Sequence, residues 1–171
     1  MSVELRRANR SDADFLLELV TGEDTREFLG RPPESLDEVL ADIDRSEHEP
    51  ESFGWFVAEA DGERVGSASY RVANARHGIV EGGRLAVHPR FRGCKLGDDV
   101  ARAFQRLVLG EMGFHRLEVQ IYGFNERAIA HAERVGYVRE GVKRRAYLKG
   151  GEWQDAVLYS MLQDELVREN H

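Results

Sequence analysis

Cysteine and proline are scarce in this 171-residue sequence, which contains one cysteine, Cys94, and four prolines. A single cysteine cannot form an internal disulfide, and we expect a protein of a reducing, cytoplasmic compartment. No cysteine and histidine residues have the spacing of metal ligands, so the sequence predicts no metal site. Long hydrophobic runs are missing too. Segments such as Phe15-Leu16-Leu17 are too short to cross a membrane, and residues 1–20 do not have the pattern of a signal peptide.

Positive charge is also in short supply, because 24 lysines and arginines face 31 acidic residues and the net charge is −7. A nucleic-acid-binding protein needs a basic surface, so we do not expect nucleic acid as a partner. The acidic residues gather between Gly22 and Gly54, where eleven of them face only Arg26, Arg31 and Arg45. Two interpretations stay open: solvated helix faces, or a surface that concentrates a cationic substrate.

The length and the 42% apolar content predict one globular domain, residues 1–171. Alternating hydrophobicity predicts seven strands, at about 3–7, 53–60, 64–72, 79–87, 116–122, 137–148 and 152–162. Periodicity and capping residues predict four helices, starting at Ser11, at the Ser35–Glu38 capping box, at about Asp98 and at Glu126. This order predicts an α/β (α+β) fold, a mixed, mostly antiparallel twisted sheet with helices on both faces.

The segment HPRFRGCKLGDDVARAF, residues 88–104, places a basic loop with glycine directly before an amphipathic helix. A helix N-terminus offers unpaired N–H groups and the positive end of a dipole, which suit a bound anion. A solvated turn between a strand and a helix has the same appearance. The loop by itself does not decide between them.

Residues 81–103, followed by NERAIAHAERVGYVREG at 125–141, resemble the GNAT superfamily of acetyl-CoA-dependent N-acetyltransferases. The tail KGGEWQDAVLYSMLQDEL, residues 149–166, is similar to the branch that contains ribosomal-protein N-terminal acetyltransferases and spermidine N-acetyltransferases. The resemblance is strong over residues 81–163, while the first 80 residues match only in the order of predicted elements. It implies a GNAT-like fold that binds acetyl-CoA.

The resemblance also implies which residues hold acetyl-CoA. The strand before the loop would pair with the pantetheine arm, the N–H groups of the loop would hold the pyrophosphate, and an asparagine after the next strand would contact the arm. In this order, the residues are Leu85, Ala86 and Val87; Arg92, Gly93, Cys94, Lys95, Leu96, Gly97 and Asp98; and Asn125. Glycine permits close approach of the backbone, and successive N–H groups form an anion cradle.

Two positions of the loop depart from the family pattern. Lys95 stands where the family usually has glycine, so it brings backbone strain but also a cation for the phosphates. Asp98 stands where many members have serine or threonine, and it adds negative charge close to a diphosphate. Asp98 and Asp99 also suit a helix N-terminus, and capping with the side chains in solvent is the simpler interpretation.

Acetyl transfer to an amine needs a base, because an alkylamine is almost entirely protonated at neutral pH. Glu81 stands at the position of the family's frequent base, and alternation places Glu81 and Val87 on one side of the strand. A solvated glutamate at a strand end is the alternative. The usual tyrosine acid is absent, because Ala132 occupies its position. His131, Tyr122 or no side chain at all are the open choices for the acid.

The sequence thus predicts an N-acetyltransferase that acts on a primary amine. The acceptor is a polyamine, a peptide N-terminus or another small amine, and the acidic first third favours a basic one. The alternative is a non-catalytic module that senses acyl-CoA or docks a partner, and a third is a GNAT-like domain that binds no CoA. The closing hairpin at Gly150-Gly151 has an exposed edge that two chains of a homodimer can share.

Overall fold

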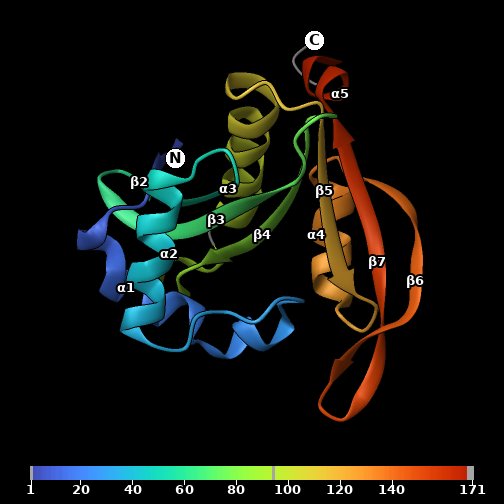
Figure 1. Cartoon of the computed structure of the whole chain (residues 1–171), viewed down its shortest axis with the longest axis horizontal. Helices are drawn as coiled ribbons and strands as arrows, with labels where there is room; N and C mark the ends of the chain where they lie inside the picture. The colour runs from blue at the N-terminus through green and yellow to red at the C-terminus, as the bar shows by residue number, and fades with distance from the viewer. Residues whose placement is uncertain (1, 94, 169–171) are drawn as a thin grey trace.

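Seven strands form one mixed sheet in the computed structural model, which describes residues 2–93 and 95–168 (Figure 1). The strand order is β1-β2-β3-β4-β5-β7-β6. All neighbours are antiparallel except β4 and β5, which are parallel because the chain crosses between them through a helix. The strands are β1 (Val3–Arg7), β2 (Phe53–Ala60), β3 (Glu63–Asn74), β4 (Ile79–Val87), β5 (Arg116–Tyr122), β6 (Val138–Lys149) and β7 (Glu152–Leu162). The predicted fold class is confirmed.

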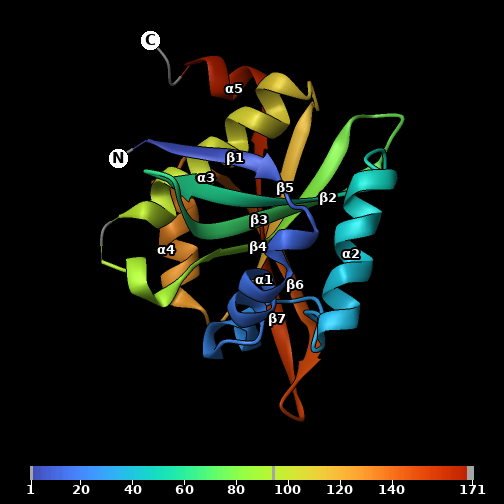
Figure 2. The same ribbon diagram turned by 90° about the vertical axis from the view of Figure 1, so that its left-hand side faces the viewer.

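Helices cover both faces of this sheet (Figure 2). The helices are α1 (Ala13–Val20), α2 (Leu36–His48), α3 (Leu96–Gln105), α4 (Glu126–Arg134) and α5 (Gln163–Arg168). One face packs Leu16 of α1 and Ile43 of α2 against Trp55. The other packs Phe104 of α3 against Phe56 and the strands that follow. Alternate residues of β2 therefore enter two different cores, as expected for a strand buried on both sides.

Short helical turns, which the sequence analysis did not predict, join the longer elements. They are η1 (Arg10–Asp12), η2 (Glu23–Glu27), η3 (Pro89–Phe91) and the π-helical η4 (Arg106–Glu111). The prediction that Ser11 caps the first helix was wrong. Asn9 caps the η1 turn that leads into α1, and its side chain accepts a hydrogen bond from the Ser11 N–H at 2.9 Å, while α1 itself begins after Asp12. The expected box at Ser35 is half formed: Ser35 accepts from the Glu38 N–H, but the Glu38 carboxylate accepts from the Glu34 N–H.

A β-bulge interrupts β4 at Arg84, where φ is +47° and the register with β3 shifts. A Cβ at Gly82 would point at Phe104, and Leu85, three residues later, also packs against the α3 side. In a regular strand, positions three apart would face opposite sides. The expectation that Glu81 shares a side with Val87 was therefore wrong, because the bulge adds a residue between them.

The parallel pair β4–β5 separates soon after it begins. Pairing joins only Ile79, Val80 and Glu81 to residues 116–118 in the described part of the chain, although both strands continue. Figure 1 shows the two strands diverging toward their carboxyl ends. The loop before α3 follows one of these ends, and the start of α4 follows the other. Ligands of sheets with parallel strands commonly bind at such carboxyl ends.

Candidate active site

The loop between β4 and α3 folds around two residues with left-handed backbone. Gly93 has φ +84°, and Lys95, which caps α3, has φ +59° and ψ +18°. A non-glycine residue in this region is uncommon and costs about 1 kcal/mol, so the strain expected at Lys95 is present. Left-handed residues in a loop turn successive N–H groups toward one side, where they can hold an anion. The guanidinium of Arg92 and the ammonium of Lys95 supply positive charge nearby, so these residues fit a diphosphate.

The first residues of α3 hold this loop against the body of the protein. The side chain of Leu96 is 2% exposed and packs with Val100, so only its backbone is available to a ligand. A Cβ at Gly97 would lie 3.9 Å from Nε2 of His131 and 4.0 Å from Val87, so residues of both α4 and β4 lie close to the start of α3. Cys94 lies outside the described residues.

Leu85, Ala86 and Val87 occupy the end of β4, after the bulge and beyond the part that pairs with β5. Their side chains and their pairing partners on β3 fix the strand, with Ala86 opposite Ser67 and Val87 opposite Gly66. Because β5 has already moved away, the described residues include no strand partner for this stretch on the β5 side, which is the geometry that an extended ligand would need.

Asp98, in the first turn of α3, is held by two side chains of α4. Arg134 donates from Nε and Nη2 to the two carboxylate oxygens, at 2.9 and 2.8 Å, and His131 Nε2 lies 3.3 Å away. The hydrogen bonds from Arg134, against the opposing effect of burial, hold the pKa of Asp98 below its ordinary value. The simple expectation that Asp98 points into solvent was wrong, since its side chain is 17% exposed.

On its other side, the loop contacts the acidic segment η2. Arg92 forms an ion pair with Asp24, and Asn125 donates from Nδ2 to the carboxylate of Glu27 at 3.2 Å. The other polar atom of the Asn125 side chain, Oδ1, accepts from the Ala128 N–H and caps α4. Figure 1 shows the segment after α1 running toward the lower end of α4. Carboxylates of η2 thus bind two of the residues expected to hold acetyl-CoA.

The three catalytic candidates lie on neighbouring elements. Glu81, the last residue of β4 that pairs with β5, accepts from Nη2 of Arg71 at 2.6 Å. Tyr122 ends β5, is 4% exposed and stacks on Phe124 with ring centroids 5.1 Å apart. Burial, with a smaller effect of Tyr147, raises the pKa of Tyr122. A phenol stays protonated in such a place and is able to donate a proton.

His131 lies on α4 with its Nε2 beside the N-terminus of α3. Burial lowers the pKa of His131, although the Gly97 backbone and the Asp98 carboxylate act in the opposite direction. A histidine with a lowered pKa is mostly neutral at pH 7, which weakens its case as a proton donor. The surroundings of His131 are those of the loop and not of the end of β5 where Tyr122 lies.

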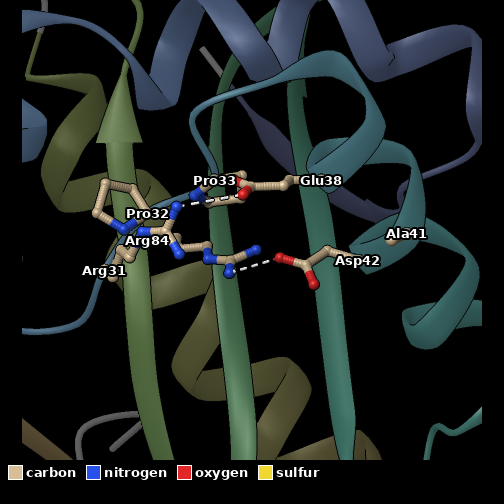
Figure 3. A pocket seen from close by; sticks show the side chains of 7 residues that line it. All are labelled: Arg31, Pro32, Pro33, Glu38, Ala41, Asp42 and Arg84. Carbon is tan, nitrogen blue, oxygen red and sulfur yellow. Dashed lines mark hydrogen bonds and ion pairs between the residues drawn. The ribbon is translucent and has the colours of Figure 1, made fainter.

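A pocket of about 200 Å³ lies between α2 and the bulge of β4 (Figure 3). Two ion pairs line it, Arg31 with Glu38 at 3.2 Å and Arg84 with Asp42 at 2.7 Å. The guanidinium of Arg84 also lies over the ring of Trp55, at 4.4 Å. Its buried Nη1 has no hydrogen-bond partner among the described residues.

Sequence reasoning missed Arg134, Asp24 and Arg84. The pair Gly82-Gly83 before Arg84 was a usable signal, because glycine inside a strand often marks a bulge. Nothing in the local sequence pointed to Arg134 or Asp24, since their partners lie far away along the chain.

The described residues contain no group of three or more histidine, cysteine or acidic side chains that could hold a metal ion. None of the helices in residues 2–93 and 95–168 combines the length and the apolar character needed to cross a bilayer.

Known proteins resemble this chain in both sequence and structure. A family model described as an acetyltransferase (GNAT) domain matches residues 2–138. Spermidine N(1)-acetyltransferase of Escherichia coli (strain K12) is 22% identical over 169 residues, which cover 99% of this chain and 90% of that protein. The uncharacterized N-acetyltransferase YokL, from the SPbeta prophage of Bacillus subtilis, is 24% identical over 117 residues, 68% of this chain and 66% of YokL.

Among solved structures, spermidine N-acetyltransferase from Vibrio cholerae, in complex with CoA and spermine, superposes with a TM-score of 0.86. It is 21% identical and the match covers 97% of this chain and 98% of that one. A point mutant of the Vibrio cholerae enzyme gives a TM-score of 0.84 at 20% identity, over 99% of each chain. At this level of identity the likeness concerns the fold.

The mixed sheet, with parallel strands that separate beside a loop at a helix start, agrees with the fold of these acetyltransferases. Since the family model covers most of its length, the chain belongs to the GNAT acetyltransferase family. It is an N-acetyltransferase that uses acetyl-CoA, as the sequence resemblance implied.

Proposed function

We propose that the protein transfers the acetyl group of acetyl-CoA to a primary amine of a polyamine. The main structural support for the site is that β4 and β5 separate, and that β4 is followed by the loop with left-handed Gly93 and Lys95. The polyamine acceptor is supported by the relatives, of which two are spermidine acetyltransferases. The acidic segment η2 and the acidic helix α2 follow one another along the chain and can attract a polycation.

The residues expected to hold acetyl-CoA act mainly through their backbone. The loop of Arg92, Gly93, Lys95 and Gly97 holds the diphosphate with its N–H groups and two cations. The end of β4 pairs with the pantetheine arm, and Asn125 contacts the same arm once its amide leaves Glu27. When bound, the co-substrate supplies the thioester carbonyl at which the acetyl group is transferred.

Chemistry at this carbonyl needs an unprotonated amine. We assign Glu81 as the base, because it stands where the strands part and carries a carboxylate that Arg71 positions. Glu81 takes a proton from the ammonium, directly or through water. Attack of the free amine then forms the C–N bond and breaks the C–S bond. The new amide nitrogen releases its extra proton to solvent water, and the departing thiolate takes a proton. We assign Tyr122 as the donor of that proton, because its raised pKa keeps the phenol protonated, whereas the lowered pKa of His131 leaves its imidazole mostly without the second proton at pH 7.

The activity is tested with purified protein, acetyl-CoA and spermidine, following thiol release with time and the acetylated product by mass spectrometry. Spermidine-dependent thiol release with an acetylated product supports the proposal. Acetylation of a ribosomal peptide N-terminus but not of spermidine would move the acceptor to the peptide class. Acetyl-CoA binding without turnover on any amine would favour a sensor.

The role of Glu81 is tested by Glu81→Gln. With no base, kcat falls about 10²-fold or more, and the residual rate rises with pH as free amine becomes available. Glu140→Gln is the matched control, because Glu140 is also a strand glutamate paired with an arginine, but on the edge strand β6. Equal rates of Glu81→Gln and the wild type across the pH range would remove Glu81 from the mechanism.

We also propose that two copies associate through the C-terminal hairpin. The edge strand β6 exposes Val138, Val142 and Leu148, and the start of β7 exposes Trp153, with 60% of its surface accessible. An exposed edge with apolar side chains favours strand pairing with a second chain. Light scattering that gives the mass of two chains, and of one chain for Leu148→Glu, is the expected result. The cytoplasmic location and the lack of a nucleic-acid partner stay predictions from composition.

A further inference from the structure

Asp98 presents an electrostatic problem to the site just described. It lies in the first turn of α3, three residues after the left-handed Lys95, where the N–H groups of the loop and helix meet. A carboxylate in this turn stabilises the helix dipole, but it repels a diphosphate bound at the same helix end. An ionised Asp98 without a partner would therefore weaken acetyl-CoA binding.

The structure contains an arrangement that removes this repulsion. Both carboxylate oxygens of Asp98 are occupied by Arg134, in a bidentate pair at 2.8 and 2.9 Å. Such a pair fixes the direction of the carboxylate as well as its charge. The Asp98 side chain is 17% exposed and that of Arg134 is 55% exposed, so the pair lies at the edge of the loop and not in the core.

Arg134 also joins two elements that the sequence separates. It ends α4, which follows β5 and is capped by Asn125, while Asp98 lies in the first turn of α3, which follows β4. Through this pair, with His131 beside Gly97, the helices that follow the two diverging strands are tied together. A change that breaks this pair leaves the Asp98 carboxylate without its counter-charge. It also removes the contact that fixes the first turn of α3 to α4.

We propose that Arg134 is a positioning residue for acetyl-CoA: by binding Asp98 it neutralises and orients the carboxylate that would otherwise oppose the diphosphate. The inference rests on the proposed cofactor site. Arg134 acts through Asp98, and its own contact with the phosphates is not required.

The proposal predicts an unusual pattern in a double-mutant cycle. Acetyl-CoA affinity is measured by calorimetric titration for the wild type, Arg134→Gln, Asp98→Asn and the double variant. Arg134→Gln weakens binding roughly 5- to 10-fold, because Asp98 is left charged beside the diphosphate. Asp98→Asn binds as tightly as the wild type or up to a few-fold more tightly. In the double variant the affinity returns to within about 2-fold of the wild type.

Steady-state kinetics gives a second readout. In Arg134→Gln, KM for acetyl-CoA rises, while kcat and KM for the amine stay unchanged. Arg127→Gln is the control, because Arg127 is an exposed arginine on the same helix. The melting temperature of each variant shows whether it is folded.

Three results would overturn the inference: unchanged affinity in Arg134→Gln, no recovery in the double variant, or weaker binding in Asp98→Asn. The second and third would mean that Arg134 does not act on acetyl-CoA by neutralising Asp98. Failure of the wild type to bind acetyl-CoA is a different result, because it would remove the proposed function itself.

Discussion

Two aspartates of this molecule are each held by arginine near a helix start, but in regions with different roles. Asp12 precedes α1, is fully buried, and lies between Arg6, which donates at 2.7 and 2.8 Å, and Arg64 at 3.0 Å. Asp98, at the start of α3, is partly exposed and held by Arg134. The chemistry is the same, while the burial and the neighbourhood differ.

The difference in burial indicates that the Asp12 ion pairs stabilise the fold, whereas the Asp98 ion pair lies beside the proposed acetyl-CoA site. Asp12 is enclosed by η1 and by the strands β1 and β3, which supply its arginine partners. The Asn9 N–H donates to the same carboxylate at 2.9 Å. Around Asp98 lie the start of α3 after a strained loop, the end of α4, and the cations Arg134 and Arg102. We therefore expect Asp12 to control stability and the loop region to control acetyl-CoA binding.

The largest effect is expected on stability, from a substitution of the buried Asp12. Asp12→Asn removes the buried carboxylate that pairs with Arg6 and Arg64, and leaves Arg6 with Glu59 alone. It destabilises the fold by about 3 kcal/mol, since breaking a buried pair is costly. For a chain of this size that lowers Tm by about 6–12 °C, measured by thermal unfolding. Asp14→Asn, an exposed residue in the next turn, is the control. A loss of acetyl-CoA affinity without a loss of stability would contradict the assignment.

The loop is expected to give the opposite result. Arg92→Gln removes a charge-assisted contact to the diphosphate and weakens acetyl-CoA binding by about 10- to 100-fold, with little change in Tm. The exposed Arg90, two residues earlier in the chain, provides the control Arg90→Gln. If both variants bind equally well, the diphosphate does not bind at this loop.

A smaller effect of opposite sign is expected on the η2 side. Asp24 occupies Arg92 in the structure, so it competes with the diphosphate for one guanidinium. Asp24→Asn should tighten acetyl-CoA binding by about 2- to 5-fold, measured by calorimetric titration. Glu23→Gln makes the same change of charge in the same segment and should leave the affinity unchanged. Weaker binding in Asp24→Asn would show that Asp24 holds Arg92 in place for the ligand.

The smallest effect is expected in the pH dependence of the free energy of unfolding, through the ion pair between Asp98 and Arg134. Arg134 lowers the pKa of Asp98 in the folded state, so the pair stabilises the fold above the unfolded pKa of about 3.9. This stabilisation is lost as the pH falls through the lower, folded pKa. Wild type and Asp98→Asn should thus differ by about 0.5 kcal/mol at pH 5–8 and converge below pH 4.

The readout for this comparison is urea unfolding at several pH values, with Asp99→Asn as the control. A constant difference between wild type and Asp98→Asn down to the lowest pH would show that the ionised carboxylate is not what stabilises this region. At Asp12, burial opposes ionisation, but hydrogen bonds from Arg6 and the Asn9 backbone still lower the pKa. Asp12→Asn should therefore show the same convergence from a larger starting difference.

Local pattern predicted some parts of this structure well. The strands at Val3–Arg7 and Arg116–Tyr122 were located to the residue, because their hydrophobic alternation reflects the two faces of the sheet. The bulge at Arg84 was missed and reversed the assignment of faces along β4. A bulge is set by pairing with β3, and alternation within one strand does not contain that information.

In the candidate site, too, the features set by neighbours in the chain were predicted, and those set by distant residues were not. The positions of Gly93, Lys95 and Asn125 follow from a contiguous motif, because a loop at a helix start is built from neighbours in the chain. The partners of these residues come from elsewhere: Asp24 lies 68 positions before Arg92, and Arg134 lies 36 positions after Asp98.

The sequence by itself determined the order of strands and helices along the chain, and short motifs that resemble a known family indicated that family and the loop expected to bind a diphosphate. These follow from periodicity and short motifs, whose physics acts within a few residues of the chain. Only the tertiary structure decided which charges face the loop and which are neutralised. Ion pairs depend on distances of about 3 Å between side chains brought together by packing, and those distances exist only once the sheet and both layers of helices have formed.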